Sequence, residues 1–241
     1  MTRFFAFFLM CAAGAAQAID LSPERCQAKD PDGLAYIALG STVLKLPIRH
    51  LNVTSAPASS APPLMAPDPN EPVGCRNNPL RQQSLMINFG FDAWLKARDK
   101  PSGALLKEMT LIASSTDYWG IPLDERHATR CKLYPRTRTL TNGLVGCLPA
   151  LAPRHPDRDE VGSYRARPEV YKAPFDKPFV VACRPSIPKG TECHVSYKIL
   201  PTVNITYVFV TSRLALDDVI EFDKRFREDV QRAVVPEYKW N

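Results

Sequence analysis

Four histidines, seven cysteines and one cluster of carboxylates and aromatic side chains are the residues of this chain that could carry chemistry. The histidines lie among polar or proline-rich residues, and their spacing is not that of metal ligands. A lone histidine in such surroundings is typical of an exposed, solvated side chain. We therefore predict neither a base nor a metal ligand among His50, His127, His155 and His194.

The densest group of polar and aromatic residues spans residues 117–127. Two carboxylates there, from Asp117 and the 124–125 pair, would suit acid–base hydrolysis. A loop with Tyr118, Trp119 and Arg126 as anchors would instead suit a protein interface, where Tyr, Trp and Arg supply most of the binding energy. An ordinary turn with a half-buried tryptophan is the third interpretation. As interface candidates we name these three anchors, followed by Arg76 in another loop.

The chain carries no sequence motif of a known catalytic or cofactor site. A nucleophile elbow, a phosphate-binding loop, a dinucleotide fingerprint and a zinc-protease motif are all missing from the sequence. The net charge of +6 is mild for 241 residues, and no basic stripe is interleaved with aromatic residues. We predict a protein that is not an enzyme, with no cofactor, no bound metal and no nucleic-acid partner.

The first 18 residues have the three parts of a secretory signal peptide. Arg3 gives a positive start, residues 4–16 form an apolar run, and residues 16–18 (Ala-Gln-Ala) are a small-x-small cleavage site. The run is too short for a membrane-spanning helix. We predict removal of this segment, a single periplasmic domain of residues 19–241 and no stable membrane span. Lipid attachment at Cys11 is the alternative, disfavoured because a methionine precedes it instead of a small residue.

After cleavage, the remaining cysteines enter an oxidising compartment and should pair. Six cysteines allow fifteen connectivities, and local context selects among them. The predicted pairs are Cys183–Cys193, Cys131–Cys147 and Cys26–Cys75. The first pair joins two facing strands, the second flanks a turn at 141–143, and the third follows by elimination. A loop of about 50 residues closed by the third pair would contribute roughly 3–4 kcal/mol.

Short apolar segments bounded by turn residues predict a loop-rich α+β fold built from antiparallel β-hairpins. Gly40-Ser41 predicts a tight hairpin turn of type II′. Proline-rich stretches at 52–70 and 149–178 are predicted to be connections, and the second could subdivide the domain. The predicted strands are 34–39, 42–47, 85–91, 105–113, 179–183, 193–197 and 204–211.

An amphipathic helix is predicted at residues 219–234, ended by Pro236. Asp217 or Asp218 should cap it, with Glu221 completing a capping box. The predicted apolar face consists of Val219, Phe222, Phe226, Val230 and Val234. The predicted solvent face consists of Asp223, Lys224, Arg227, Glu228 and Arg232.

In layout the chain resembles the exported immunity proteins of bacterial type VI secretion systems, in particular those encoded beside phospholipase effectors. The resemblance covers the signal peptide, the 34–47 hairpin, the long loop ending at Gly74-Cys75, and the final strand and helix. It implies a periplasmic protein that binds a toxic enzyme and blocks its active site, and it transfers no individual site residue. We predict such a stoichiometric inhibitor with a protein partner. A periplasmic hydrolase using the 117–127 region and a structural envelope protein are the alternatives.

The export prediction is tested on protein purified from the natural host. We expect mass analysis to find a mature N-terminus at Ile19, because the cleavage site ends at Ala18. A chain that begins at a lipid-bearing Cys11 would contradict a soluble periplasmic protein.

Overall fold

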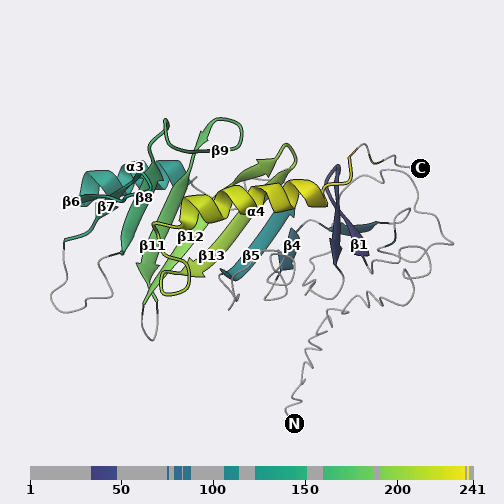
Figure 1. The fold of residues 1–241 in the computed structure, drawn as a ribbon, viewed down its shortest axis with the longest axis horizontal. Coiled ribbons are helices and arrows are strands. Elements are labelled where there is room, and N and C mark those ends of the chain that lie inside the picture. The colour runs from purple at the N-terminus through teal and green to yellow at the C-terminus, as the bar shows by residue number, and fades with distance from the viewer. Residues whose placement is uncertain are drawn as a thin grey trace, which may run out of the picture.

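The computed structural model describes residues 34–47, 75, 79–82, 84–87, 106–113, 123–150, 160–186, 190–236 and 238. Within these residues the chain forms an eight-stranded sheet, a three-stranded sheet, a two-stranded hairpin and two helices, α3 and α4 (Figure 1). The predicted class is confirmed: antiparallel strands predominate, an amphipathic helix follows the last strand, and disulfides are present.

The eight-stranded sheet is antiparallel throughout. Its strands lie in the order β4 (Ser84–Ile87), β5 (Leu106–Ala113), β13 (Val203–Val210), β12 (Thr191–Leu200), β11 (Val180–Pro185), β8 (Gly162–Ala166), β7 (Leu144–Leu148) and β6 (Arg136–Thr139). Each strand that falls on a predicted one agrees with it to within a few residues. The predicted 149–178 connection is wrong in part, since β8 lies inside it and inside the sheet.

Strand β13 shows why the sheet forms where it does. Its sequence VNITYVFV is β-branched or aromatic at almost every position, which favours an extended backbone. Alternate residues from Val203 to Phe209 are fully buried on one face, including Tyr207. The buried face continues across the sheet, because Tyr207 pairs with Val195 on β12, which in turn pairs with Val181 on β11.

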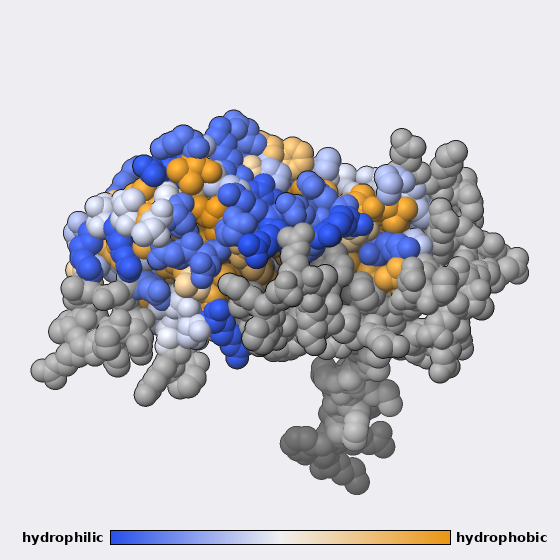
Figure 2. All heavy atoms as spheres, in the orientation of Figure 1, coloured by the Kyte–Doolittle hydropathy of each residue, from blue (hydrophilic) through white to orange (hydrophobic). Residues whose placement is uncertain are grey.

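Helix α4 (Val219–Ala233) lies across this apolar face (Figure 1). The rings of Phe222 and Phe226 both pack edge-on against Tyr207, with centroids 5.8 and 5.6 Å away. The outer side of the helix is hydrophilic (Figure 2). One part of the predicted solvent face is wrong, because Asp223 is fully buried against the sheet.

The start of α4 is held by the turn between β6 and β7. Asp218 is the N-cap residue, but its side chain makes no capping hydrogen bond, so the predicted capping box is wrong. Asp217 instead accepts hydrogen bonds from the backbone N–H and hydroxyl of Thr141, at 3.0 and 2.6 Å. The amide of Asn142 donates to the carbonyls of Leu216 and Asp217. These bonds fix the β6–β7 turn to the helix start.

The end of α4 is held by the three-stranded sheet, whose order is β2 (Thr42–Pro47), β1 (Leu34–Leu39) and β3 (Leu80–Gln82). Val234 forms a β-bridge with Leu44, and the N–H of Val235 donates to the carbonyl of Val43 at 2.9 Å. The predicted β1–β2 hairpin is confirmed, and Gly40 adopts the positive φ of 60° that its turn needs.

Helix α3 (Leu123–Leu133) lies on the opposite face of the large sheet from α4. Neighbouring residues Ser163 and Tyr164 of β8 point to opposite faces; Tyr164 joins the core beneath α4, and Ser163 contacts α3 through His127. The disulfide Cys131–Cys147 ties α3 to β7. The pairing is as predicted. Because residues 124–127 lie in helix α3, the prediction of a loop there is wrong.

The predicted disulfide Cys183–Cys193 joins directly opposite residues of β11 and β12 in the core. Cys75 is also disulfide-bonded. Its predicted partner Cys26 lies outside the described residues, as do the signal peptide, Cys11 and the 52–70 loop. None of the described helices has the length and apolar character needed to cross a membrane.

Truncation of Phe226 tests the packing of α4. We expect Phe226→Ala to lower the free energy of unfolding by about 3–5 kcal/mol, because a fully buried ring is lost. Urea titration measures this loss. Gln231→Ala, on the solvent side of the same helix, is the control and should change stability by less than about 0.5 kcal/mol. Equal losses in the two variants would mean that α4 does not dock through this face.

Candidate functional site

A fully buried carboxylate is the most unusual feature of the described structure. Asp223 of α4 faces the centre of the sheet, where three tyrosine hydroxyls converge on it. Tyr197 of β12 and Tyr207 of β13 each donate to Oδ1 at 2.7 Å, and Tyr171 donates to Oδ2 at 2.6 Å. Arg227, one helical turn further on, places Nε 3.1 Å from Oδ2. We call these five residues the Asp223 cluster.

Burial dominates the electrostatics of the Asp223 cluster. Loss of solvent raises the pKa of Asp223 to about 7, against the lowering effect of the hydrogen bonds from Tyr197 and Tyr207. Burial likewise raises the pKa values of both tyrosines well above 10, so their hydroxyls stay protonated and keep donating. The pKa of Arg227 falls to about 10 for the same reason, and its guanidinium remains charged at neutral pH.

Within the described residues the carboxylate of Asp223 is fully buried, and we interpret the effect of the Asp223 cluster as positional. It fixes Tyr171 through the carboxylate, and the Arg227 guanidinium donates to the carbonyl of Lys172 at 2.9 Å. The same guanidinium lies over the Tyr171 ring at 4.5 Å, and that ring packs edge-on against Phe179. Tyr171 and Lys172, which lead into the β9–β10 hairpin, are therefore held rigidly to α4.

That hairpin, β9 (Lys172–Ala173) and β10 (Lys177–Pro178), carries an exposed aromatic residue at its tip. Phe175 is 51% exposed and, with Asp176, has a φ of 60°. A bulky side chain rarely adopts this left-handed conformation, which costs of order 1–3 kcal/mol. An ion pair of 2.6 Å between Lys172 and Asp176 closes the turn. We call residues 172–178 the Phe175 hairpin.

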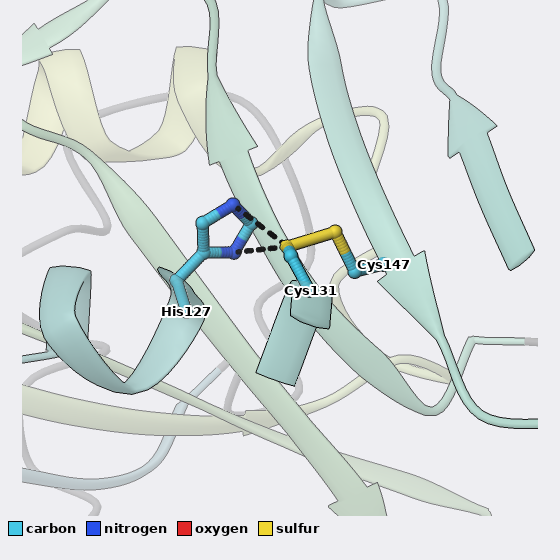
Figure 3. Close-up of side chains that lie close together, drawn as sticks. All are labelled: His127, Cys131 and Cys147. Carbon is cyan, nitrogen blue, oxygen red and sulfur yellow. Dashed lines mark hydrogen bonds between the residues drawn. A yellow bond between two sulfur atoms is a disulfide. The ribbon is translucent and has the colours of Figure 1, made fainter. Parts of the chain in front are cut away.

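A second polar group lies under α3 (Figure 3). His127 is buried, with Nδ1 3.1 Å from Ser163 Oγ and Nε2 3.4 Å from Cys131 Sγ. Burial, with the positive charges of Arg165 and Arg130, lowers the pKa of this imidazole and keeps it neutral at pH 7. The prediction of an exposed histidine is wrong at this position. His127, Cys131 and Cys147 each bring a ligand atom within 4.8 Å of the others.

A third group stabilises the β11–β12 hairpin. The buried carboxylate of Glu192 accepts two hydrogen bonds from Arg184, at 3.0 and 2.6 Å, and lies 3.1 Å from Nε2 of His194. His194 is half-buried. Because Arg184 and His194 both contact the Glu192 carboxylate from two adjacent strands, we interpret this group as structural.

The structure describes only one of the predicted interface anchors. Arg126 lies exposed on α3, one residue before the buried His127. Tyr118, Trp119 and Arg76 lie outside the described residues, so their grouping with Arg126 stays a prediction. Sequence reasoning missed both Phe175 and Asp223. A signal for Asp223 existed, because it falls on the helical stripe that Val219 and Phe226 define, at spacings of four and three.

Comparison with known proteins gives little further information. The chain matches no protein-family model. No curated protein is similar to it in sequence. A solved structure with some likeness is described as an immunity protein of the Stenotrophomonas maltophilia type IV secretion system; its TM-score is 0.41 and its identity 11%, over 84% of this chain and 93% of that one. A likeness of this size does not establish a shared fold, and no function is transferred from it.

The raised pKa of Asp223 predicts a specific pH dependence of stability. The folded pKa of about 7 lies above the ordinary 3.8, so between these values the folded state binds the proton more tightly. Stability from this group is therefore present at low pH and is lost as pH rises toward 7. Relative to Asp223→Asn, the wild-type free energy of unfolding should fall by about 2–3 kcal/mol between pH 5 and 8.

Urea titration of both proteins at the two pH values measures this difference. The variant supplies the control, since it shares every other titrating group. A wild-type advantage that stays constant between pH 5 and 8 would contradict the prediction, and would mean that Arg227 keeps the carboxylate ionised across the range.

Proposed function

We propose that this chain is an exported binding protein that neutralises a toxic secreted enzyme by occluding it stoichiometrically, without turnover of its own. The observation that supports this most directly is Phe175, a large apolar side chain held out in solvent on a strained turn. Strained backbone persists where the surrounding structure over-determines it, and such positions concentrate at binding and switching sites. Aromatic side chains, Phe included, are enriched at the cores of protein interfaces.

Pre-organisation gives the Phe175 hairpin its value as an anchor. Binding costs free energy when loops and side chains must become ordered. Here Tyr171 and Lys172 are held to α4, the turn is closed by the Lys172–Asp176 ion pair, and Ala173 is buried beneath the hairpin. Little ordering therefore remains when a partner covers Phe175.

The chemistry around Phe175 describes the surface it would fit. Lys177, Glu169 and Arg167 are exposed in the neighbouring segments, and Val170 is a second exposed apolar side chain. An apolar anchor within a charged surround matches the apolar centre and polar rim of a protein interface. The partner we propose has an apolar recess for the aromatic ring, bordered by both signs of charge.

The compartment and the secretion system belong to the same proposal. Disulfides in the described chain are typical of an oxidising, extracytoplasmic environment, and the signal peptide predicted at residues 1–18 supports a periplasmic location. The sequence layout favours a periplasmic inhibitor. Its proposed partner is an enzyme delivered by a type VI secretion system, in particular a phospholipase.

Replacement of Phe175 by glycine should separate stability from binding. Because glycine adopts a φ of 60° without strain, we expect Phe175→Gly to raise the free energy of unfolding by about 1 kcal/mol. Loss of the anchor should weaken binding to the candidate partner, the product of the neighbouring gene, by at least about tenfold. Urea titration and calorimetry measure the two effects.

Leu133→Ala is the matched control, because Leu133 is an exposed apolar side chain away from the hairpin. Trp119→Ala and Arg126→Ala, measured beside it, test the other predicted anchors. Unchanged affinity in Phe175→Gly would remove the hairpin from the interface. Turnover of a lipid or peptidoglycan substrate by the purified chain, abolished by Asp117→Asn, would contradict the binding function and establish a hydrolase.

A further inference from the structure

Strand β6 forms one edge of the eight-stranded sheet, at the opposite end from β4 (Figure 1). It pairs with β7 on one side, and among the described residues no strand pairs with its other side. Thr137, Arg138 and Thr139 are exposed. The outer side of an edge strand presents a row of backbone donors and acceptors, which another extended segment can pair with.

The register shows which backbone groups of β6 face outward. Leu140 donates its N–H to the carbonyl of Leu144, so these two residues form a hydrogen-bonded pair of the β6–β7 hairpin. Hydrogen-bonded and non-hydrogen-bonded pairs alternate along an antiparallel ladder. The next pair, Thr139 with Val145, is therefore non-hydrogen-bonded, as is the pair that contains Thr137. The N–H and C=O groups of both threonines point away from β7, toward the outer side.

The side chains of β6 place two positive charges on one face of this edge. The strand reads RTRT, so Arg136 and Arg138 share one face of the sheet and the two threonines share the other. The threonine face is the face of α3, because Thr137 lies opposite Cys147, whose sulfur bonds to Cys131 of that helix. The arginines therefore lie on the opposite face, at alternate positions of the strand.

This charge pattern decides between two kinds of partner strand. In an antiparallel pair of two β6 strands, residues of the same face meet, so arginine would lie directly opposite arginine. Like charges in that position destabilise a strand pair, whereas opposite charges stabilise it. The net charge of +6 on each chain adds to the repulsion between two copies. Charge complementarity therefore favours a segment with acidic side chains over a second copy of this chain.

Strand β6 is held at both ends before a partner binds. Helix α3 ends at Leu133, shortly before the strand, and the Cys131–Cys147 disulfide ties that helix to β7. At the other end, the amide of Asn142 in the β6–β7 turn donates to two carbonyls just before α4. A strand fixed in this way loses little conformational freedom on binding, which lowers the free-energy cost of association.

We propose that the outer side of β6 binds an extended segment of a partner protein, with acidic residues opposite Arg136 and Arg138 and β-branched residues opposite Thr137 and Thr139. The segment continues the antiparallel sheet as a ninth strand. Backbone hydrogen bonds supply the affinity in this mode of recognition, and the alternating side chains supply the specificity. The inference does not depend on the proposed inhibitor function, because it involves no residue of the Phe175 hairpin.

The test uses residues 19–241 with the disulfides intact and two labelled heptapeptides with capped ends. One peptide alternates glutamate with valine, and the other alternates lysine with valine. By fluorescence anisotropy at low salt, we expect the glutamate peptide to bind at least about tenfold more tightly. Amide hydrogen exchange followed by NMR should slow at Thr137 and Thr139 when this peptide is added, because their outward N–H groups become hydrogen-bonded.

Two variants at one position test the backbone contact. Thr139→Pro removes an outward N–H, a change that edge strands tolerate because the ladder bonds on the other side are kept. It should weaken binding of the glutamate peptide by at least about tenfold, whereas Thr139→Val keeps the N–H and should match the wild type. Near-ultraviolet circular dichroism reports whether both variants keep the fold.

Charge reversal tests the side-chain contact without a proline. A chain that carries Arg136→Glu and Arg138→Glu should prefer the lysine peptide, by about the factor with which the wild type prefers glutamate. Equal binding of the glutamate peptide to the wild type and Thr139→Pro, or an unchanged preference after charge reversal, would overturn the proposal. A concentration-dependent wild-type dimer that Thr139→Pro abolishes would also overturn it, by assigning the edge to a second copy.

Discussion

The carboxylate of Asp223 organises the described structure, because an ionisable group without access to water must be satisfied entirely by neighbouring side chains. Tyr171, Tyr197 and Tyr207 supply hydroxyl donors, and Arg227 supplies the countercharge. Each donor comes from a different part of the chain, so the helix can dock in one register alone. An apolar residue at this position would leave three buried hydroxyls without their acceptor, each at a cost of about 1–3 kcal/mol.

Specific contacts at both ends complete the placement of α4. The β6–β7 turn binds the start of the helix through hydrogen bonds of Asp217 and Asn142. The edge strand of the three-stranded sheet holds its end through the Leu44–Val234 bridge. The helix thus connects the β6–β7 hairpin, at one edge of the large sheet, to the β1–β2 hairpin of the three-stranded sheet. Apolar packing supplies most of the free energy, while these polar contacts decide orientation.

Local patterns in the sequence predicted the elements whose stability is local. The 34–47 hairpin has apolar segments on both sides of a Gly-Ser turn, and Cys183 and Cys193 lie on adjacent strands. Helix α3 was missed because His127 is its single buried residue and a disulfide fastens it, so no apolar stripe marks it. Phe175 was missed for another reason: its positive φ belongs to the tight turn between β9 and β10, and no Gly or Asn in the sequence marks that turn.

The bridge between Leu44 and Val234 has a consequence for the order of folding. A polypeptide that leaves the ribosome, or crosses a membrane, with its N-terminus leading exposes the β1–β2 hairpin long before the residues that border it exist in the same compartment. Contacts of such large sequence separation form late and slow the folding rate. The β1–β2 hairpin therefore keeps an open edge until Val234 is available, so chaperone protection of that edge matters most before helix α4 arrives.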